Sequence, residues 1–189
     1  MLHFPRLSPL LTGALLGVLA SGTQAAAPTP APDTLQPLLA TINERLNLAD
    51  QVALTKWDSG KPIQDTARET QVIANARRQA IEHKLDPDDA AELVAAQIEA
   101  NKLVQYGLLA QWQAASKAPD VPRPDLNKIR PQLDELQNRL LQQYADFTPY
   151  RVDPDCPAWL AAQRSSLIKD ALHGQALIRA TGELCIAEQ

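Results

Sequence analysis

The sequence predicts an all-α protein, a single-domain bundle of about six helices. Apolar residues recur at helical spacing along most of the chain, and no segment shows the alternation that is typical of a strand. Glycine occurs only seven times in 189 residues, and aromatic side chains make up 4 % of the chain, so the residues that mark hairpins and strands are scarce. Helices that are apolar on one side bury that side by packing together in a bundle.

The first 25 residues have the pattern of a secretory signal peptide. Arg6 precedes an apolar run over residues 10–20, and small residues lead to a cleavage site after Ala25. The alternative is a membrane anchor, but the run is too short to span a bilayer comfortably, so we expect cleavage and no membrane contact afterwards. Residues 26–33 form an Ala/Pro-rich leader, extended or disordered, and residues 34–189 form the expected folded domain of a periplasmic or secreted protein.

The charge of the mature chain argues against a nucleic-acid partner. Removal of residues 1–25 takes away Arg6 alone among the charged residues, which leaves a net charge of 17 minus 22, or −5. An acidic chain has no basic surface for a phosphate backbone. Any site for an anion must therefore be a local cluster of cationic side chains.

Start and stop signals define the first three helices. The first is expected over residues 33–57, where Asp58, Gly60 and Pro62 interrupt the helical pattern. The second opens at residue 65 or 66 and reaches about residue 84. The third has Asp86 as its N-cap and Pro87 in its first position, where the missing N–H of proline does no harm, and it extends to about residue 116.

Three further helices are expected after a Pro-rich linker at residues 118–124. They cover residues 125–146, 157–171 and 174–186, and Pro131 indicates either a start nearer Asn127 or a bend in the first of them. Cys156 and Cys185 flank the last two helices. In an exported chain an even pair of cysteines indicates a disulfide, which would stabilise the fold by about 3–4 kcal/mol. A free nucleophile or a metal ligand is the alternative, with little support because the mature chain has only two histidines.

Cationic side chains occupy positions of the first helix that are expected to face the core. Arg45 and Lys56 are eleven residues apart, close to three helical turns, so they share a face with Ala49 and Val52 of the apolar stripe. Their Cα atoms would lie about 16 Å apart along the helix axis. Two long side chains at that separation could enclose a small ligand between them.

The following helices place more polar groups on expected apolar faces. Each amide that is buried without a partner costs about 1–3 kcal/mol, so such residues need an explanation. They are Gln97, Asn101 and Gln105 on the third helix, Asp65, Arg68 and Glu69 at the start of the second, and Arg130 near the start of the fourth.

An excess of inward cations indicates a missing anion. An internal network, for example Arg68 with Glu69 or Asp65, would explain any one of these residues taken alone. The four cations expected to face inward, Arg45, Lys56, Arg68 and Arg130, outnumber the inward acids, however, and buried charges need partners. A small substrate with two negative charges would supply them, and the sequence offers no cluster of ligands for a metal and no catalytic triad.

The spacing of these residues resembles that of the all-helical (AroQ-type) chorismate mutases. Lys56 follows Arg45 by eleven residues, Arg68-Glu69 comes twelve residues later, and Gln105 lies on the next helix. The resemblance is strongest in the stretches "ERLNLADQVALTKWDSGKPIQDTARE" and "QIEANKLVQYGLLAQW". With the export signal, the Pro-rich loop and the cysteine pair, the chain is similar to the secreted, or gamma, subclass.

The resemblance implies an isomerase that converts chorismate to prephenate by a Claisen [3,3] rearrangement, without a cofactor, in the biosynthesis of phenylalanine and tyrosine. It implies catalytic roles for Lys56 and Gln105, which would donate hydrogen bonds to the ether oxygen of the substrate. The other implied substrate-binding residues are Arg45, Arg68 and Arg130 for the two carboxylates, and Glu69, Asp65 and Asn101 for the hydroxyl group or for orienting the cations. All would come from one chain, and the subclass makes a homodimer plausible.

Two other functions could use the same residues. One is a non-catalytic periplasmic binding module for a small dicarboxylate, which would bind chorismate without consuming it. The other is a helical adaptor whose inward cations form internal ion pairs, so that loss of Lys56 would change stability more than ligand affinity.

Overall fold

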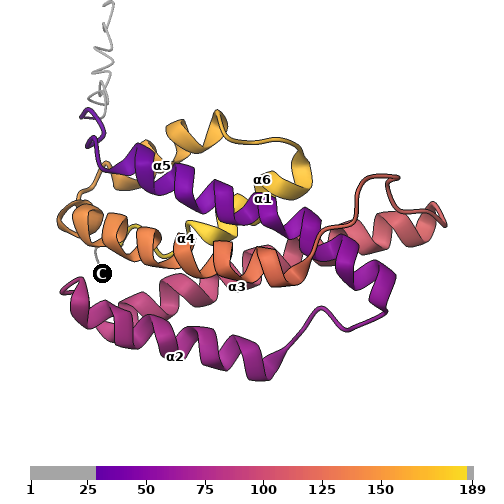
Figure 1. Ribbon diagram of the computed structural model, residues 1–189. Helices are drawn as coiled ribbons and strands as arrows, with labels where there is room; N and C mark the ends of the chain where they lie inside the picture. Colours follow the sequence, from indigo (N-terminus) through magenta and orange to yellow (C-terminus); the bar gives the residue numbers. More distant parts are fainter. Residues whose placement is uncertain (1–28, 187–189) are drawn as a thin grey trace, which may run out of the picture.

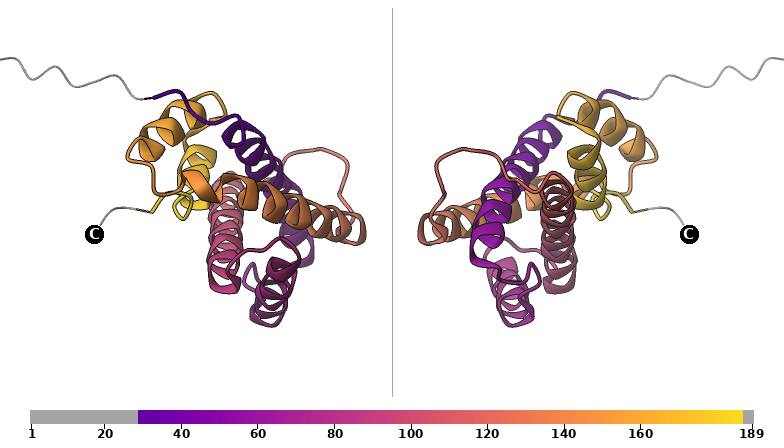
Figure 2. Two further views of the ribbon diagram at one scale, coloured as in Figure 1. Left: turned by 90° about the vertical axis from the view of Figure 1, so that its left-hand side faces the viewer. Right: turned by 90° about the vertical axis from the view of Figure 1, so that its right-hand side faces the viewer.

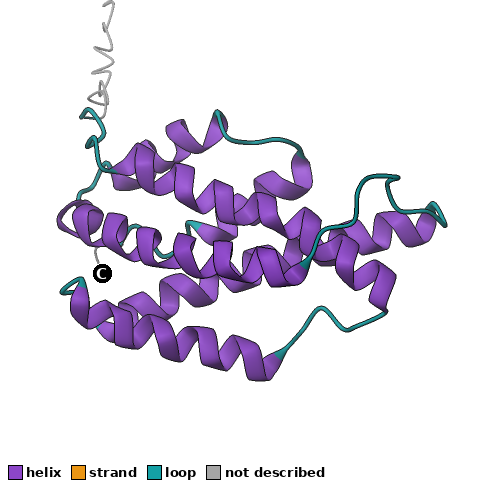
Figure 3. Ribbon diagram, viewed as in Figure 1, coloured by secondary structure: helices purple, strands orange, loops and turns teal. Residues whose placement is uncertain are grey.

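The computed structural model describes residues 29–186, and in that part of the chain every regular element is helical (Figure 3). The elements are α1 (Leu35–Ser59), α2 (Thr66–Glu82), α3 (Pro87–Ala114), α4 (Leu126–Phe147), the short 3-10 helix η1 (Thr148–Tyr150), α5 (Cys156–Ser165) and α6 (Ala171–Ala180). The predicted all-α bundle of six helices is confirmed. The predicted signal peptide lies outside the described residues.

The third helix is the centre of the bundle. It packs against α1, α2 and α6, while α4 lies along α1 (Figures 1 and 2). Fully buried side chains from α1, α3 and α4 form the main core, among them Leu38, Ile42, Leu93, Tyr144 and Phe147. In contrast, α2 buries only Ala76 and Ala80. Its N-terminal half therefore lies against the bundle without a fully buried anchor.

Local hydrogen bonds fix the ends of α1 and α2. Gly60 ends α1 with a φ of 64°, a left-handed conformation that glycine adopts without steric cost, and its N–H donates to Lys56 O at 2.9 Å. At the start of α2, Asp65 Oδ1 accepts from Arg68 N–H at 3.1 Å and Glu69 Oε1 accepts from Asp65 N–H at 3.0 Å. These two reciprocal hydrogen bonds resemble a capping box, with the glutamate one position further along the helix, and fix the turn that carries Arg68.

The sequence prediction is wrong for the last two helices. The fifth ends at Ser165 and not at residue 171, and the sixth covers Ala171–Ala180 and not 174–186. The reason is Asp170, whose side chain accepts from His173 N–H at 2.9 Å and therefore caps a new helix. Pro131 lies inside α4, which begins at Leu126, so the helix lacks the hydrogen bond that an N–H at residue 131 would donate to the preceding turn.

A disulfide and a hydrogen bond connect α5 to the two ends of the described chain. The predicted disulfide is confirmed: Cys156 and Cys185 are bonded, with their Cα atoms 5.8 Å apart. Thr29, the first described residue, is also ordered here, since its N–H donates to Asp155 Oδ2 at 2.7 Å. Among the helices of residues 29–186, none has both the length and the apolar character to cross a membrane.

Candidate functional site

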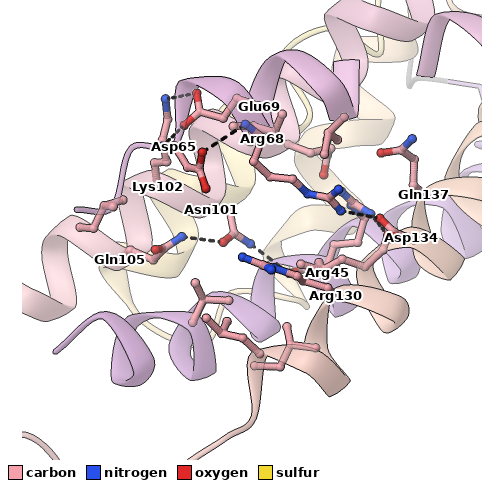
Figure 4. A pocket seen from close by; sticks show the side chains of 18 of the residues that line it. Arg45, Asp65, Arg68, Glu69, Asn101, Lys102, Gln105, Arg130, Asp134 and Gln137 are labelled. Atoms are coloured by element: carbon pink, nitrogen blue, oxygen red, sulfur yellow. Dashed lines mark hydrogen bonds and ion pairs between the residues drawn. The ribbon is translucent and has the colours of Figure 1, made fainter. Parts of the chain in front are cut away.

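A pocket of about 170 Å³ opens between α1, α2, α3 and the N-terminal half of α4 (Figure 4). All eight residues that the sequence analysis selects for substrate binding line it: Arg45, Lys56, Asp65, Arg68, Glu69, Asn101, Gln105 and Arg130. These residues span 86 positions of the chain, from 45 to 130, and meet only because four helices converge. The structure thus brings together every predicted substrate-binding residue.

The pocket also contains polar residues that sequence reasoning missed. Lys102, Asp134 and Gln137 line it. Gln97 lines it too, although the sequence analysis selected it only as one of three amides on the expected apolar face of the third helix. Seven apolar side chains complete the wall: Val52, Ile63, Val72, Ile98, Leu126, Ile129 and Leu133. A pocket in which apolar side chains surround convergent polar groups is typical of sites for small molecules.

The lining has an excess of two positive charges. The five cationic residues are Arg45, Lys56, Arg68, Lys102 and Arg130, and the three carboxylates are Asp65, Glu69 and Asp134. Because the pocket walls limit the access of water, such an excess attracts a ligand with two negative charges more strongly than an open surface would.

The charged groups differ in their depth. Arg45 and Gln105 are buried, at 7 % and 5 % exposure, while Lys56 and Arg68 are half-buried. Arg130 is exposed, so the expectation that all the cations face the core is wrong for this residue. The first turns of α4 form the rim of the pocket, and Arg130 therefore lines the opening and not the floor.

Arg45 is the deepest cation of the pocket. Its Nη1 donates to Leu133 O at 2.7 Å, but its buried Nε has no hydrogen-bond partner among the described residues. Burial lowers the pKa of Arg45 to about 10, an effect that the negative charge of Asp134 partly opposes. Arg45 therefore remains a cation at neutral pH, with an N–H that still needs an acceptor.

Two amides on α3 are linked in a chain. Gln105 Nε2 donates to Asn101 Oδ1 at 2.9 Å, and Asn101 Nδ2 donates to the backbone oxygen of Arg45 at 3.2 Å. The buried Gln105 Oε1 has no partner within residues 29–186. Gln97 serves the fold instead, since its Nε2 donates to Ala180 O on α6 at 2.6 Å.

Lys56 and Arg68 are each held by one wall of the pocket. Lys56 Nζ donates to Pro62 O at 2.7 Å, within the loop that connects α1 to α2. Arg68 Nη2 lies 3.1 Å from Asp134 Oδ1 on α4. Neither bond uses all of the N–H donors of its side chain, so both cations retain donors for a ligand.

Glu69 has two partners of its own. Its Oε1 accepts from Asp65 N–H at 3.0 Å, and its Oε2 lies 3.1 Å from Lys102 Nζ on α3. Figure 4 shows this group next to Arg68, with Asn101 and Gln105 on the neighbouring helix. Among the described residues, no three or more His, Cys, Asp and Glu side chains gather in an arrangement that could hold a metal ion.

Fold and pocket together define a class: an all-helical bundle with an interior pocket whose lining carries an excess of positive charge. The sequence profile of the family "Chorismate mutase type II" matches residues 36–106. A secreted chorismate mutase of Mycobacterium tuberculosis is 32 % identical over 99 % of this chain and 98 % of that protein. The crystal structure of a chorismate mutase from Burkholderia phymatum is 43 % identical, with a TM-score of 0.79 over 82 % of this chain and 97 % of that one.

A second solved structure agrees with these relatives. It is a chorismate mutase from Burkholderia thailandensis, 35 % identical, with a TM-score of 0.78 over 82 % of this chain and all of that one. The chain therefore belongs to the chorismate mutase family, of the all-helical secreted type.

Proposed function

We propose that this chorismate mutase converts chorismate to prephenate within the pocket formed by α1–α4. The observation that supports this most is the excess of two positive charges in the pocket, together with two buried polar atoms that have no partner among the described residues, Arg45 Nε and Gln105 Oε1. An unpartnered N–H needs an acceptor, and an unpartnered carbonyl oxygen needs a donor. A hydroxylated dicarboxylate such as chorismate offers both.

The reaction needs positioning and electrostatics more than reactive side chains. In the intramolecular [3,3] rearrangement the C–O ether bond breaks while a C–C bond forms, and no group is transferred to the protein. The flexible dianion must be held in a compact chair-like shape, which removes part of the entropic barrier. Negative charge grows on the ether oxygen, so donors already in place around that oxygen lower the barrier further.

Three arginines would hold the two carboxylates. Arg45 on the floor of the pocket offers its free Nε, Arg68 offers the donors that Asp134 leaves, and Arg130 at the rim is exposed and accessible to a ligand. Planar guanidinium groups bind carboxylates through paired hydrogen bonds, which fixes orientation as well as affinity.

Lys56 and Gln105 would donate to the ether oxygen. Lys56 Nζ uses one N–H for Pro62 O, and Gln105 Nε2 uses one for Asn101 Oδ1, so each nitrogen is held by the protein and has at least one further N–H. The lysine adds a positive charge where negative charge develops. The glutamine donates at any pH, because its amide does not titrate.

The remaining residues would contact the substrate hydroxyl or orient the cations. Glu69 is held by Asp65 N–H and Lys102, which keeps its carboxylate at the pocket wall. Asn101 lies between Gln105 and the backbone of Arg45 and would keep both in place. Relatives that bear the name secreted chorismate mutase agree with the export predicted from the first 25 residues, and the protein acts in the periplasm or outside the cell. A homodimer stays a prediction.

A chorismate assay on the mature protein tests the proposal. The ultraviolet absorbance of chorismate should fall as prephenate forms, and Lys56→Ala and Arg68→Ala should each reduce kcat/KM by at least about a hundredfold, the usual effect of removing a donor to a transition state. Lys128→Ala is the matched control, because Lys128 is exposed on α4 and does not line the pocket. Binding of chorismate without turnover, or full activity in both variants, would contradict the proposal.

A further inference from the structure

Lys102 is a cation in the pocket wall to which the proposed function assigns no contact with the substrate. It lies on α3 next to Asn101, and only 14 % of its side chain is exposed. Its Nζ contacts two carboxylates, Glu99 Oε1 at 2.7 Å on the same helix and Glu69 Oε2 at 3.1 Å on α2. The bond to Glu69 thus joins two helices at the pocket, whereas the bond to Glu99 is local.

The start of α2 depends on such polar bonds. Within α2 the buried residues are Ala76 and Ala80, both in the C-terminal half, so the first turn itself contains no buried side chain. That turn nevertheless supplies Asp65, Arg68 and Glu69 to the pocket. The ion pairs that join this turn to other helices are Lys102 with Glu69, from α3, and Asp134 with Arg68, from α4.

The bond to Lys102 continues into the backbone of the turn. Glu69 uses Oε2 for the lysine and Oε1 for Asp65 N–H, and Asp65 Oδ1 in turn accepts from Arg68 N–H. A change at the lysine can therefore reach the backbone of Arg68 through three successive hydrogen bonds. The hydrogen bond to Glu99 raises the pKa of Lys102, with a smaller contribution from Glu69, so the lysine stays protonated at neutral pH.

We propose that Lys102 is a positioning residue for substrate binding: it holds the Glu69 carboxylate, and through it the first turn of α2, in the orientation that the pocket requires. It also neutralises Glu69, whose charge would otherwise repel a dianion at close range. This inference rests on the proposed function for its kinetic consequence, but the contact itself can be measured without turnover.

Steady-state kinetics on three single variants test the role. Lys102→Met keeps the bulk of the side chain and removes the charge, and it should raise KM roughly tenfold, the effect of losing one charge-assisted hydrogen bond, with a smaller change in kcat. Lys102→Arg should restore KM to within about threefold, since it can still bond a carboxylate. Glu99→Gln is the matched control: it removes the other partner of the same lysine, lies outside the pocket lining, and should leave KM unchanged.

The double variant separates a positioning role from a direct contact with the substrate. If Lys102 acts through Glu69, the effect of Lys102→Met on KM should disappear in a Glu69→Gln background, because residues that act as a unit are not additive. An equal effect of Lys102→Met on KM in both backgrounds would overturn the proposal. An increase in KM for Glu99→Gln as large as that for Lys102→Met would also overturn it.

Amide hydrogen exchange gives a readout that does not depend on activity. In full-length Lys102→Met the Asp65 N–H, which bonds to Glu69, should exchange at least about tenfold faster than in the wild type, while amides around Ala76 should be unchanged. A wild type that does not consume chorismate would refute the proposed function and leave this prediction standing. Unchanged exchange at Asp65 would refute the positioning role, whatever the activity.

Discussion

Arg68 and Asp134 form an ion pair that connects α2 to α4 beside the pocket, with Arg68 Nη2 and Asp134 Oδ1 3.1 Å apart (Figure 4). Asp134 is also the carboxylate whose charge opposes the effect of burial on the pKa of Arg45. A single acidic residue at the rim therefore acts on two of the three arginines proposed to bind the substrate. It is also an anion that the substrate carboxylates must compete with.

The first prediction concerns this competition. Asp134→Asn keeps an oxygen that can accept from Arg68 but raises the excess charge of the pocket from two to three. Because the aspartate is largely exposed, we expect a modest tightening of dianion binding, with KM lower by about twofold to fivefold at low salt. The difference should vanish at high ionic strength. Asp134→Ala should instead raise KM, because it also removes the oxygen that holds Arg68 in place. A higher KM in Asp134→Asn would show that the negative charge of Asp134 aids binding, and would contradict the prediction.

The second prediction is a broad pH optimum. Gln105 does not titrate, and Arg45 is the pocket cation whose pKa is lowered, to about 10. Ordinary carboxyl groups titrate below about pH 5, so kcat/KM should be flat from about pH 5 to 9. At higher pH it should fall, because Arg45 loses the positive charge that binds a substrate carboxylate. Asp134→Asn should shift the alkaline fall to lower pH, because it removes the charge that opposes the effect of burial. A rate that collapses above pH 6 would exclude Gln105 as the donor.

The third prediction introduces a titrating donor. Gln105→Glu places a carboxyl group beside the proposed ether oxygen, where only the protonated form can donate a hydrogen bond. Carboxyl groups ordinarily titrate near pH 4.3, and burial shifts the pKa upward, so kcat/KM of the variant should fall at least about tenfold between pH 5 and 8. The wild type measured in the same buffers is the control. A variant as insensitive to pH as the wild type would mean that residue 105 does not donate in the transition state.

The helices and the pocket residues could be predicted because their signals are local. Arg45, Lys56 and Gln105 interrupt apolar stripes of strongly periodic helices, and that conflict between charge and periodicity is visible in the sequence. The same periodicity, together with the start and stop signals, located both ends of each of α1–α4 to within two residues. The prediction that Arg130 faces inward was wrong because periodicity does not reveal where a helix lies along a pocket, and its turn forms the rim.

The missed residues depend on contacts between distant segments. Asp134 pairs with Arg68, 66 positions earlier, and no sequence pattern links the two. Lys102 is the residue after Asn101, and its sequence context predicts a solvent-exposed lysine that pairs with Glu99 on the same helix. Only the packing of α2 on α3 brings Glu69 to it. The start of α6 is different, because Asp170 was a recognisable N-cap signal that the prediction overlooked.

The last prediction separates the stability of the fold from the activity of the site. The disulfide between Cys156 and Cys185 closes a loop with a sequence separation of 29, so Cys156→Ala/Cys185→Ala should lower the free energy of unfolding by about 3–4 kcal/mol in urea titrations. Neither cysteine lines the pocket, and kcat/KM of the folded variant should stay within about twofold of the wild type.

Gln97 makes this test informative in either direction. It lines the pocket and donates to Ala180 O at the end of α6, so it links the disulfide-bonded segment to the site. If the double cysteine variant remains folded but loses activity, α6 must support the pocket through this contact, and Gln97→Ala in the intact disulfide background should then reproduce the loss. If activity persists while stability falls, the disulfide acts on the fold alone, as expected for a cross-link that restricts the unfolded chain.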